Sequence, residues 1–256
     1  MARRPRAHDG VPPLSLALRG GSPTVRPIVE LETPNHDARP GAVDMLILHY
    51  TGMKTAKDAI DRLRDPQARV SSHYVVDEDG TIYRLVPEHL RAWHAGVSYW
   101  RGRTGLNDVS IGIEIVNPGH EWGYRPFPPA QIQSVTALSQ AILAHHPIPA
   151  RKIVGHSDVA PDRKQDPGEL FPWQELASAG VGIWPGGEGQ GTQPGAWDTA
   201  RVRTALNIVG YDGNRGDLPT LLRAFQRHWR PEFVTGEADA GTILRLDRLL
   251  RMVQPT

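Results

Sequence analysis

The sequence predicts an α/β protein in which helices flank a mixed central β-sheet, followed by a small three-helix unit. Three observations lead to this fold class. Residues 27–178 alternate between strand and helix patterns, as expected for a sheet covered by helices. Residues 179–197 are rich in Gly and Pro, a composition typical of a linker between domains. Residues 198–256 carry three apolar stripes with helical spacing.

Composition limits the possible chemistry. The 256 residues suffice for one large domain and one small one. The formal net charge of +1 favours neither nucleic acid nor anionic lipid, so we expect no nucleic-acid partner. Because the chain has no cysteine, it has no disulfides, and any metal site must use histidines and carboxylates.

The first 26 residues are expected to form a disordered tail. They begin with basic residues, as an export signal does. Their longest apolar run, LSLAL at 14–18, is shorter than the roughly 7–15 residues of a signal core. No stretch of the chain approaches the roughly 18 apolar residues of a membrane helix, so we expect no membrane span.

The first half of the main domain shows a strand, a helix and a hairpin in order. VDMLILHYT at 43–51 is a nearly continuous apolar run, typical of a strand buried on both faces. TAKDAIDRLRD at 55–65 has helical spacing and stops before a proline. SSHYVVDEDGTIYRLV at 71–86 consists of two β-rich runs around Asp79–Gly80, which predicts a hairpin.

The second half continues the alternation. VSIGIEIVN at 109–117 predicts a strand, and PAQIQSVTALSQAILAHH at 129–146 predicts a long amphipathic helix. RKIVG at 151–155 predicts a short strand that leads into the polar segment GHSDVAPDRKQDPG at 155–168.

Three short helices are predicted in the last 59 residues. Aspartates stand where helix N-caps belong, at Asp198, Asp217 and Asp239. The three apolar stripes are Val202, Leu206 and Val209; Leu222, Phe225 and Trp229; and Ile243, Leu246, Leu250 and Val253.

The polar segment at 155–168 contains candidate metal ligands. Asp166 precedes a proline, which favours extended backbone geometry. Side chains at i and i+2 of an extended segment point the same way, so Lys164 and Asp166 are predicted to share a face. His156, at the end of a strand, is placed to meet Asp166. Two such ligands do not make a zinc site, and a third is needed.

His49 is the candidate third ligand. It shares one face of its strand with Met45 and Ile47, where low-dielectric surroundings favour a neutral imidazole. The neutral form is also the one that binds zinc. Taken alone, His49 fits a hydrogen-bonded core histidine better. Combined with the segment that holds His156 and Asp166, the ligand interpretation is favoured.

Glu114 is a further candidate, for catalysis. On its strand the isoleucines at 111, 113 and 115 take one face and Glu114 takes the other, beside small neighbours that leave room for a ligand. A carboxylate in the middle of a sheet is unfavourable unless it is paired or functional. The alternative is a salt-bridged glutamate on an edge strand.

Five segments in this order resemble the zinc N-acetylmuramoyl-L-alanine amidases, which are related to phage lysozyme-type amidases and peptidoglycan recognition proteins. The resemblance spans about 27–178 and implies a mixed sheet flanked by helices, with zinc in a surface groove. The segments are HYTG (49–52), SSHYVVDEDGTIYRLV (71–86), RAWHAG (91–96), SIGIEIVN (110–117) and GHSDVAPDRKQDPG (155–168).

The resemblance implies roles for individual residues. His49, His156 and Asp166 correspond to the ligands of one Zn²⁺ ion, and Glu114 and Lys164 to catalytic groups. The implied reaction is hydrolysis of the amide bond between N-acetylmuramic acid and L-alanine. We expect Glu114 to take a proton from the attacking water and Lys164, with zinc, to stabilise the oxyanion. Many phage relatives carry a tyrosine just before the hairpin histidine, where this chain has Ser72.

Three further aromatic residues are candidates for the groove or the core. His94 is predicted to line the groove and bind substrate, with a hydrogen bond that fixes its loop as the alternative. Trp93 stacks on sugar or fills the core. His73, the hairpin histidine, is expected to be structural.

The C-terminal region resembles the three-helix peptidoglycan-binding module. The similarity lies in VRTALNIVGYDG, LLRAFQRHW and TGEADAGTILRLDRLL, and GIWP at 182–185 resembles the join of two-domain amidases. We therefore expect a peptidoglycan or muropeptide partner and a monomer. The lack of a clear signal peptide predicts the cytoplasm, whereas a wall-binding module favours the periplasm or outer membrane.

Two other functions remain open from the sequence. One is a catalytically silent peptidoglycan receptor, and the other is a zinc endopeptidase acting on the stem peptide. The choice between anhydro-muropeptide and intact peptidoglycan as substrate also remains open.

Overall fold

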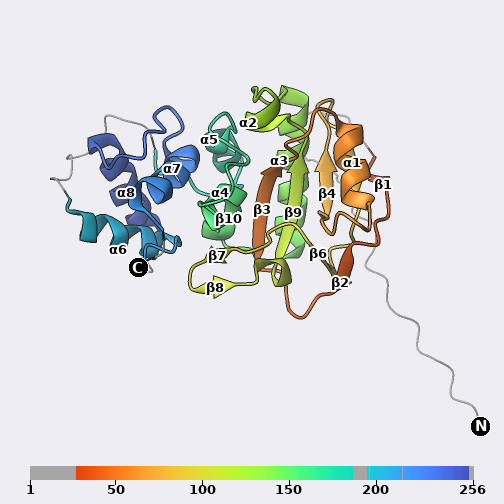
Figure 1. Cartoon of the computed structure of the whole chain (residues 1–256), viewed down its shortest axis with the longest axis horizontal. Coiled ribbons are helices and arrows are strands. Elements are labelled where there is room, and N and C mark those ends of the chain that lie inside the picture. Colours follow the sequence, from red (N-terminus) through yellow and green to blue (C-terminus); the bar gives the residue numbers. More distant parts are fainter. Residues whose placement is uncertain (1–26, 187–194, 196, 215, 254–256) are drawn as a thin grey trace, which may run out of the picture.

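The computed structural model describes residues 27–186, 195, 197–214 and 216–253 (Figure 1). The predicted tail at 1–26 and residues 187–194 and 196 of the predicted linker at 179–197 lie outside these residues. The predicted fold class is confirmed, because a mixed sheet with helices on its faces forms the larger part and three helices follow it.

A six-stranded sheet forms the centre of the larger part, in the order β1-β5-β4-β9-β3-β10. All neighbouring pairs are parallel except the β4–β5 hairpin, which turns at Asp79–Gly80 as predicted. In the central pair, His49 of β3 lies opposite Glu114 of β9. The strands are β1 (Val29–Glu30), β3 (Met45–Tyr50), β4 (Tyr74–Val76), β5 (Ile82–Arg84), β9 (Ser110–Ile115) and β10 (Ile153–Gly155).

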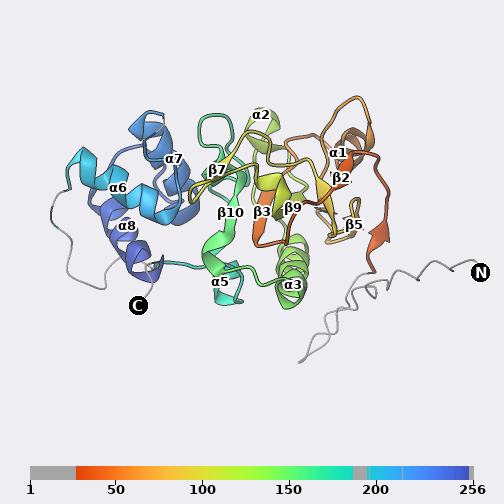
Figure 2. The same ribbon diagram turned by 90° about the horizontal axis from the view of Figure 1, so that it is seen from below.

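Helices cover both faces of this sheet (Figure 2). Helix α3 (Pro129–His145) packs on one face against Ile111, Ile113 and Ile115, as the alternation in β9 predicts. Helix α1 (Ala56–Arg64) packs on the other face, near Val75. Its first turn is capped by Thr55, whose side chain accepts a hydrogen bond from the Asp58 amide.

Several short elements were not predicted, because one turn of helix or two to three residues of strand leave little periodic pattern. They include two small antiparallel ribbons and three short helices. These elements are β2 (His36–Ala38) with β6 (Leu90–Ala92), β7 (Tyr99–Trp100) with β8 (Arg103–Thr104), α2 (Gly119–Trp122), α4 (His156–Val159), α5 (Trp173–Ser178), and the 3-10 turns Leu106–Asp108 and Ala150–Lys152.

The three C-terminal helices are α6 (Thr199–Val209), α7 (Leu218–Trp229) and α8 (Ala240–Val253). The predicted N-caps are confirmed: Asp198, Asp217 and Asp239 each accept a hydrogen bond from the main-chain amide three residues later. Within the described ranges, no helix is long and apolar enough to span a membrane.

These helices share a hydrophobic core with the β10 side of the sheet (Figure 1). Met45 and Ile47 of β3 belong to the same buried cluster as Leu206 and Phe225. The main-chain amide of Arg101, in the β7–β8 turn, donates a hydrogen bond to the Gly210 carbonyl at 2.8 Å. The strand that carries His49 therefore belongs to the same hydrophobic core as the C-terminal helices.

Candidate metal centre and active site

The three predicted ligands come from adjacent parts of the sheet and one loop. His49 is the last residue but one of the apolar strand β3, and β10 runs parallel beside that strand, so that His156, which follows β10, reaches the same end of the sheet. The loop after α4 returns Asp166 to this point, where its carbonyl accepts a hydrogen bond from the Ser157 amide at 2.8 Å. The Asp166–Pro167 peptide bond is cis.

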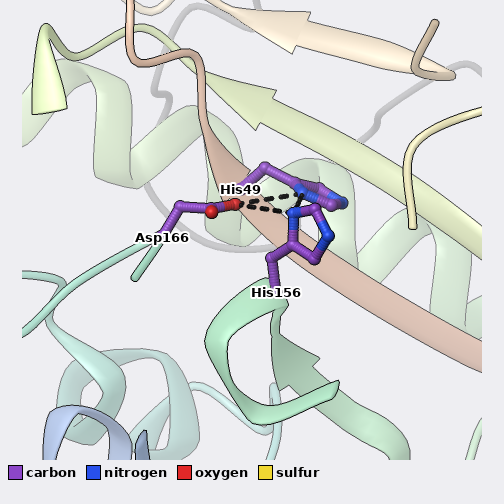
Figure 3. A group of neighbouring side chains, drawn as sticks. All are labelled: His49, His156 and Asp166. Atoms are coloured by element: carbon purple, nitrogen blue, oxygen red, sulfur yellow. Dashed lines mark hydrogen bonds and ion pairs between the residues drawn. The ribbon is translucent and has the colours of Figure 1, made fainter. Parts of the chain in front are cut away.

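The side chains of the triad point toward one another (Figure 3). Nδ1 of His49 is 2.9 Å from Nδ1 of His156, and Oδ2 of Asp166 lies 3.2 and 3.1 Å from these two nitrogens. All three residues are at most 5% exposed. Donor atoms about 2.0 Å from a tetrahedral zinc ion are about 3.3 Å apart, so the triad has the size and the donor set of a zinc site.

The electrostatic surroundings favour the metal-binding protonation states of His49 and Asp166. Burial lowers the pKa of His49 to about 4, with a further contribution from the charge of His156, so His49 is neutral at pH 7. Burial alone would raise the pKa of Asp166. The charges and hydrogen bonds of His156 and His49 outweigh it and hold that pKa well below its usual range. Neutral imidazole and ionised carboxylate are the forms that bind metals.

The outer nitrogens of both histidines contact the RAWHAG segment. Nε2 of His49 is 3.0 Å from Nδ1 of His94, and Nε2 of His156 is 3.2 Å from the carbonyl oxygen of Ala95. The Arg163 guanidinium also donates to the Ala95 carbonyl and, at 2.7 Å, to that of Val97. Such contacts orient a metal-binding imidazole through its second nitrogen.

Glu114 lies beside the triad with an unusual carboxyl environment. The residue is partly exposed to the cleft, but its Oε2 atom is buried and has no hydrogen-bond partner among the described residues. Burial raises the pKa of Glu114 well above its usual value; the negative charge of Asp166 adds to this, and Lys164 offsets part of it. A carboxyl group with a raised pKa in a cleft is suited to proton transfer.

One cavity has a volume of about 180 Å³, and the residues that line it include Glu114, Lys164, His156 and Asp166. A second cavity of about 560 Å³ adjoins it, since both share the side chains of Trp93, His94, His156 and Lys164. The positively charged residues that line this second cavity are Arg69, Arg91, Arg163 and Lys164, with Asp37 as the acidic residue among them.

The two predicted substrate-binding residues, His94 and Trp93, lie at the border of both cavities. His94 borders both cavities but is only 8% exposed, and its ring nitrogens face His49 and Ser110. Trp93 is partly exposed, and its Nε1 donates to Asp37 at 2.7 Å. Both predictions of substrate binding therefore concern residues that are already hydrogen-bonded to the protein.

The hairpin histidine lies outside the triad, in agreement with its expected structural role. Nδ1 of His73 accepts a hydrogen bond from the Gly112 amide at 3.0 Å. Burial, reinforced by the nearby Arg39 guanidinium, lowers the pKa of His73 to about 3. Ser72 is fully buried and donates to the Gly112 carbonyl, so the position at which phage relatives carry a tyrosine is a structural one here.

Sequence reasoning missed one contact and one residue of this region. The contact between His94 and His49 was not predicted. The available signal was that Ala92 and His94 share the inward face of one segment. Asp158, two residues after a ligand, was not singled out. It is buried and bonded to His228, and no local pattern indicates a partner 70 residues away.

Comparison with known proteins decides the assignment. The family model of N-acetylmuramoyl-L-alanine amidases (Amidase_2) matches residues 39–169, a range that includes the triad, Glu114 and Lys164. The chain belongs to this amidase family. The protein is therefore an N-acetylmuramoyl-L-alanine amidase, and the predicted hydrolysis of the bond between N-acetylmuramic acid and L-alanine is confirmed.

One relative, AmiD, matches this amidase along most of its chain. N-acetylmuramoyl-L-alanine amidase AmiD of Escherichia coli K12 is 40% identical over 261 residues, 91% of this chain and 94% of AmiD. The solved complex of AmiD with anhydro-N-acetylmuramic acid-L-Ala-D-gamma-Glu-L-Lys has a TM-score of 0.73 and 37% identity, covering 91% of this chain and 93% of AmiD.

Two further relatives complete the comparison. The structure of AmpDh3 from Pseudomonas aeruginosa in complex with anhydromuramic pentapeptide has a TM-score of 0.74 at 34% identity, and covers 82% of this amidase and 92% of AmpDh3. The 1,6-anhydro-N-acetylmuramyl-L-alanine amidase AmpD of Escherichia coli K12 is 37% identical over 160 residues, 55% of this amidase and 85% of AmpD.

Proposed function

We propose that this amidase is a zinc enzyme that releases the peptide from anhydro-N-acetylmuramic acid in soluble muropeptides. The observation that carries the proposal is the cluster of three donor atoms 2.9–3.2 Å apart, in a cleft that also holds Glu114 and Lys164. The anhydromuramyl ligands of the AmiD and AmpDh3 complexes support this choice of substrate.

Zinc fits the donor set of the triad. Two imidazole nitrogens and one carboxylate oxygen, with no sulfur, match the ligands of catalytic zinc sites, which keep a fourth position open. A Zn²⁺ ion held by His49, His156 and Asp166 supplies Lewis-acid activation of water and of the scissile carbonyl.

Glu114 is proposed as the group that moves the proton. Its unpartnered Oε2 atom and raised pKa suit a carboxyl group that accepts a proton from the attacking water. It then returns this proton to the nitrogen of L-alanine as the C–N bond breaks. Water thus adds its oxygen to the lactyl carbonyl carbon, and the peptide leaves with a free amine.

Lys164 is proposed to stabilise the negative charge that develops on the carbonyl oxygen. Its side chain lines the same cavity as Glu114, and its positive charge acts on both Glu114 and His49. A fixed cation at this position favours the transition state over the neutral ground-state amide.

The arginine-lined cavity beside the metal centre is proposed to receive the stem peptide. A stem such as L-Ala-D-gamma-Glu-L-Lys carries free carboxylates, which arginine binds through paired hydrogen bonds. Arg69 is exposed at this cavity, whereas Arg91 already pairs with Asp37 and Asp108.

The test compares two substrates and identifies the products by mass. Purified protein of known zinc content is incubated with anhydro-muropeptide and, separately, with intact sacculi. We expect free anhydro-N-acetylmuramic acid and a peptide that begins with L-alanine, formed faster from the soluble substrate, and loss of activity after chelation that added zinc restores. Cleavage within the stem peptide would identify an endopeptidase, and binding without cleavage would identify a receptor.

A further inference from the structure

A chain of buried polar groups leads from the metal triad into the protein interior. Nε2 of His49 is 3.0 Å from Nδ1 of His94, and Nε2 of His94 is 3.2 Å from Oγ of Ser110. The Ser110 hydroxyl is 2.7 Å from the carbonyl oxygen of Leu106. The three side chains are at most 8% exposed, so the chain ends on a protein carbonyl and not on solvent.

The carbonyl at the end sets the direction of every hydrogen bond in the chain. The Leu106 oxygen only accepts, so the Ser110 hydroxyl donates to it and offers a lone pair to His94. Nε2 of His94 then carries the ring proton. A neutral imidazole has one N–H group, so Nδ1 of His94 accepts, and the donor is Nε2 of His49.

This direction leaves Nδ1 of His49 without a proton, with its lone pair toward His156 and Asp166. If the hydrogen bonds ran in the reverse direction, Nδ1 of His94 would donate to Nε2 of His49. The ring proton of His49 would then lie on Nδ1, the nitrogen that faces the metal position. The reverse also requires the Ser110 hydroxyl to turn away from Leu106 and give up the shorter of its two hydrogen bonds.

The protein holds the His94 ring at this position from two sides. The Asn107 side chain accepts hydrogen bonds from the main-chain amides of His94 and Ala95, at 3.1 and 2.8 Å. A Cβ atom at Gly112 would lie 2.6 Å from Cγ of the His94 ring, so only glycine leaves room for it. One segment, 106–112, therefore fixes both the main chain and the ring of His94.

We propose that His94 and Ser110 are positioning residues that hold His49 in the tautomer that presents Nδ1 to the metal. They act through His49 and need not touch the substrate, which gives His94 a role other than the one predicted from sequence. The proposal rests on the zinc site of the proposed function.

The mutational test is Ser110→Ala, with Ser72→Ala as the matched control. Both serines are fully buried in the same sheet region and donate to a main-chain carbonyl, at 2.7 and 2.8 Å, but Ser72 donates to Gly112 and not along the histidine chain. We expect Ser110→Ala to raise the zinc dissociation constant, measured by chelator competition, about 2–10-fold, as for the loss of one hydrogen bond. Ser72→Ala is expected to leave it unchanged.

A measurement on the unmutated zinc-loaded protein does not depend on any variant folding. Long-range ¹H–¹⁵N NMR of the imidazole rings is expected to show His49 and His94 both protonated at Nε2. In Ser110→Ala, His94 is expected to gain a population protonated at Nδ1.

The proposal is overturned if His94 of the unmutated protein carries its proton on Nδ1, or if Ser110→Ala and Ser72→Ala bind zinc equally well. Either result leaves the proposed function intact, provided that the unmutated protein binds zinc and cleaves muropeptide. A protein that binds no zinc overturns the proposed function and this inference with it.

Discussion

The carboxylate of Asp158 lies 2.6 Å from Nδ1 of His228, and this buried pair joins helix α4 to the C-terminal helix α7. The same Oδ2 atom accepts a hydrogen bond from the Gly155 amide at 2.7 Å, and the Tyr211 hydroxyl donates to the other carboxylate oxygen. Because Gly155 directly precedes the ligand His156, the C-terminal helices are bonded to the segment that carries the metal site.

Replacing His228 should destabilise the whole protein. The ring of His228 stacks on Trp173 and Trp229, with centroid separations of 3.7 and 3.5 Å. His228→Phe therefore preserves an aromatic ring but removes one of the three hydrogen-bond partners of the buried Asp158 carboxylate. We expect a loss of about 1.5–3 kcal/mol in the free energy of unfolding, as for one hydrogen bond to a charged group, measured by urea denaturation.

A control for this prediction is Arg251→Ala, which breaks the exposed ion pair between Arg251 and Asp247. Such pairs contribute little to stability, so this variant should unfold like the parent. If His228→Phe and Arg251→Ala were equally stable, the pair with Asp158 would not hold the two parts of the chain together.

Glu114→Gln should abolish turnover while zinc stays bound. The amide has nearly the same shape but cannot accept and return a proton, so kcat should fall about 10²–10⁴-fold. Release of peptide from anhydro-muropeptide and zinc content by atomic absorption are measured on the same sample. Glu78→Gln, at a partly exposed glutamate paired with Arg125, is the control. A variant at Glu114 that turns over at the parent rate would assign the proton transfer to another group.

Lys164→Ala should lower kcat by roughly 10²–10³-fold, because one stabilising charge on the developing oxyanion is removed. The zinc dissociation constant should change little, since Lys164 is outside the ligand triad. Lys57→Ala, at an exposed lysine of α1, is the matched control. An increase in KM at constant kcat would show instead that Lys164 binds the ground-state substrate.

The buried His73 should make the metal-free protein less stable in acid. Its pKa is about 3 in the folded protein and about 6.5 in an unfolded chain, so between these values only the unfolded chain binds the proton. Stability therefore rises with pH through this window and is lost as pH falls from about 6.5 toward 3. His73 contributes about 1.4 kcal/mol per pH unit to this slope.

The measurement is the free energy of unfolding at several pH values between 5 and 7, for the parent and for His73→Asn. We expect the free energy of unfolding to depend less steeply on pH in the variant. The difference between the two slopes reports His73 alone, because His49 and His94, whose pKa values are also lowered by burial, are present in both proteins. Parallel slopes for the two proteins would contradict the prediction.

Local pattern was sufficient for the larger elements. The strands that hold His49 and Glu114 are buried on both faces, which leaves nearly continuous apolar runs in the sequence. The amphipathic stripes and aspartate caps predicted α6, α7 and α8 for the same reason, because each depends on neighbours within a few residues. The short ribbons β2–β6 and β7–β8 were missed, since two or three residues carry no period.

The sequence by itself determined the sheet, the three C-terminal helices and, through its ordered motifs, the three candidate ligands that the structure brings together. Only the tertiary structure decided that His94 contacts His49 and that Asp158 pairs with His228. These contacts join residues 45 and 70 positions apart, across different elements. Side chains so distant leave no periodic signal, because their proximity arises from how the elements pack and not from the spacing of residues along either one.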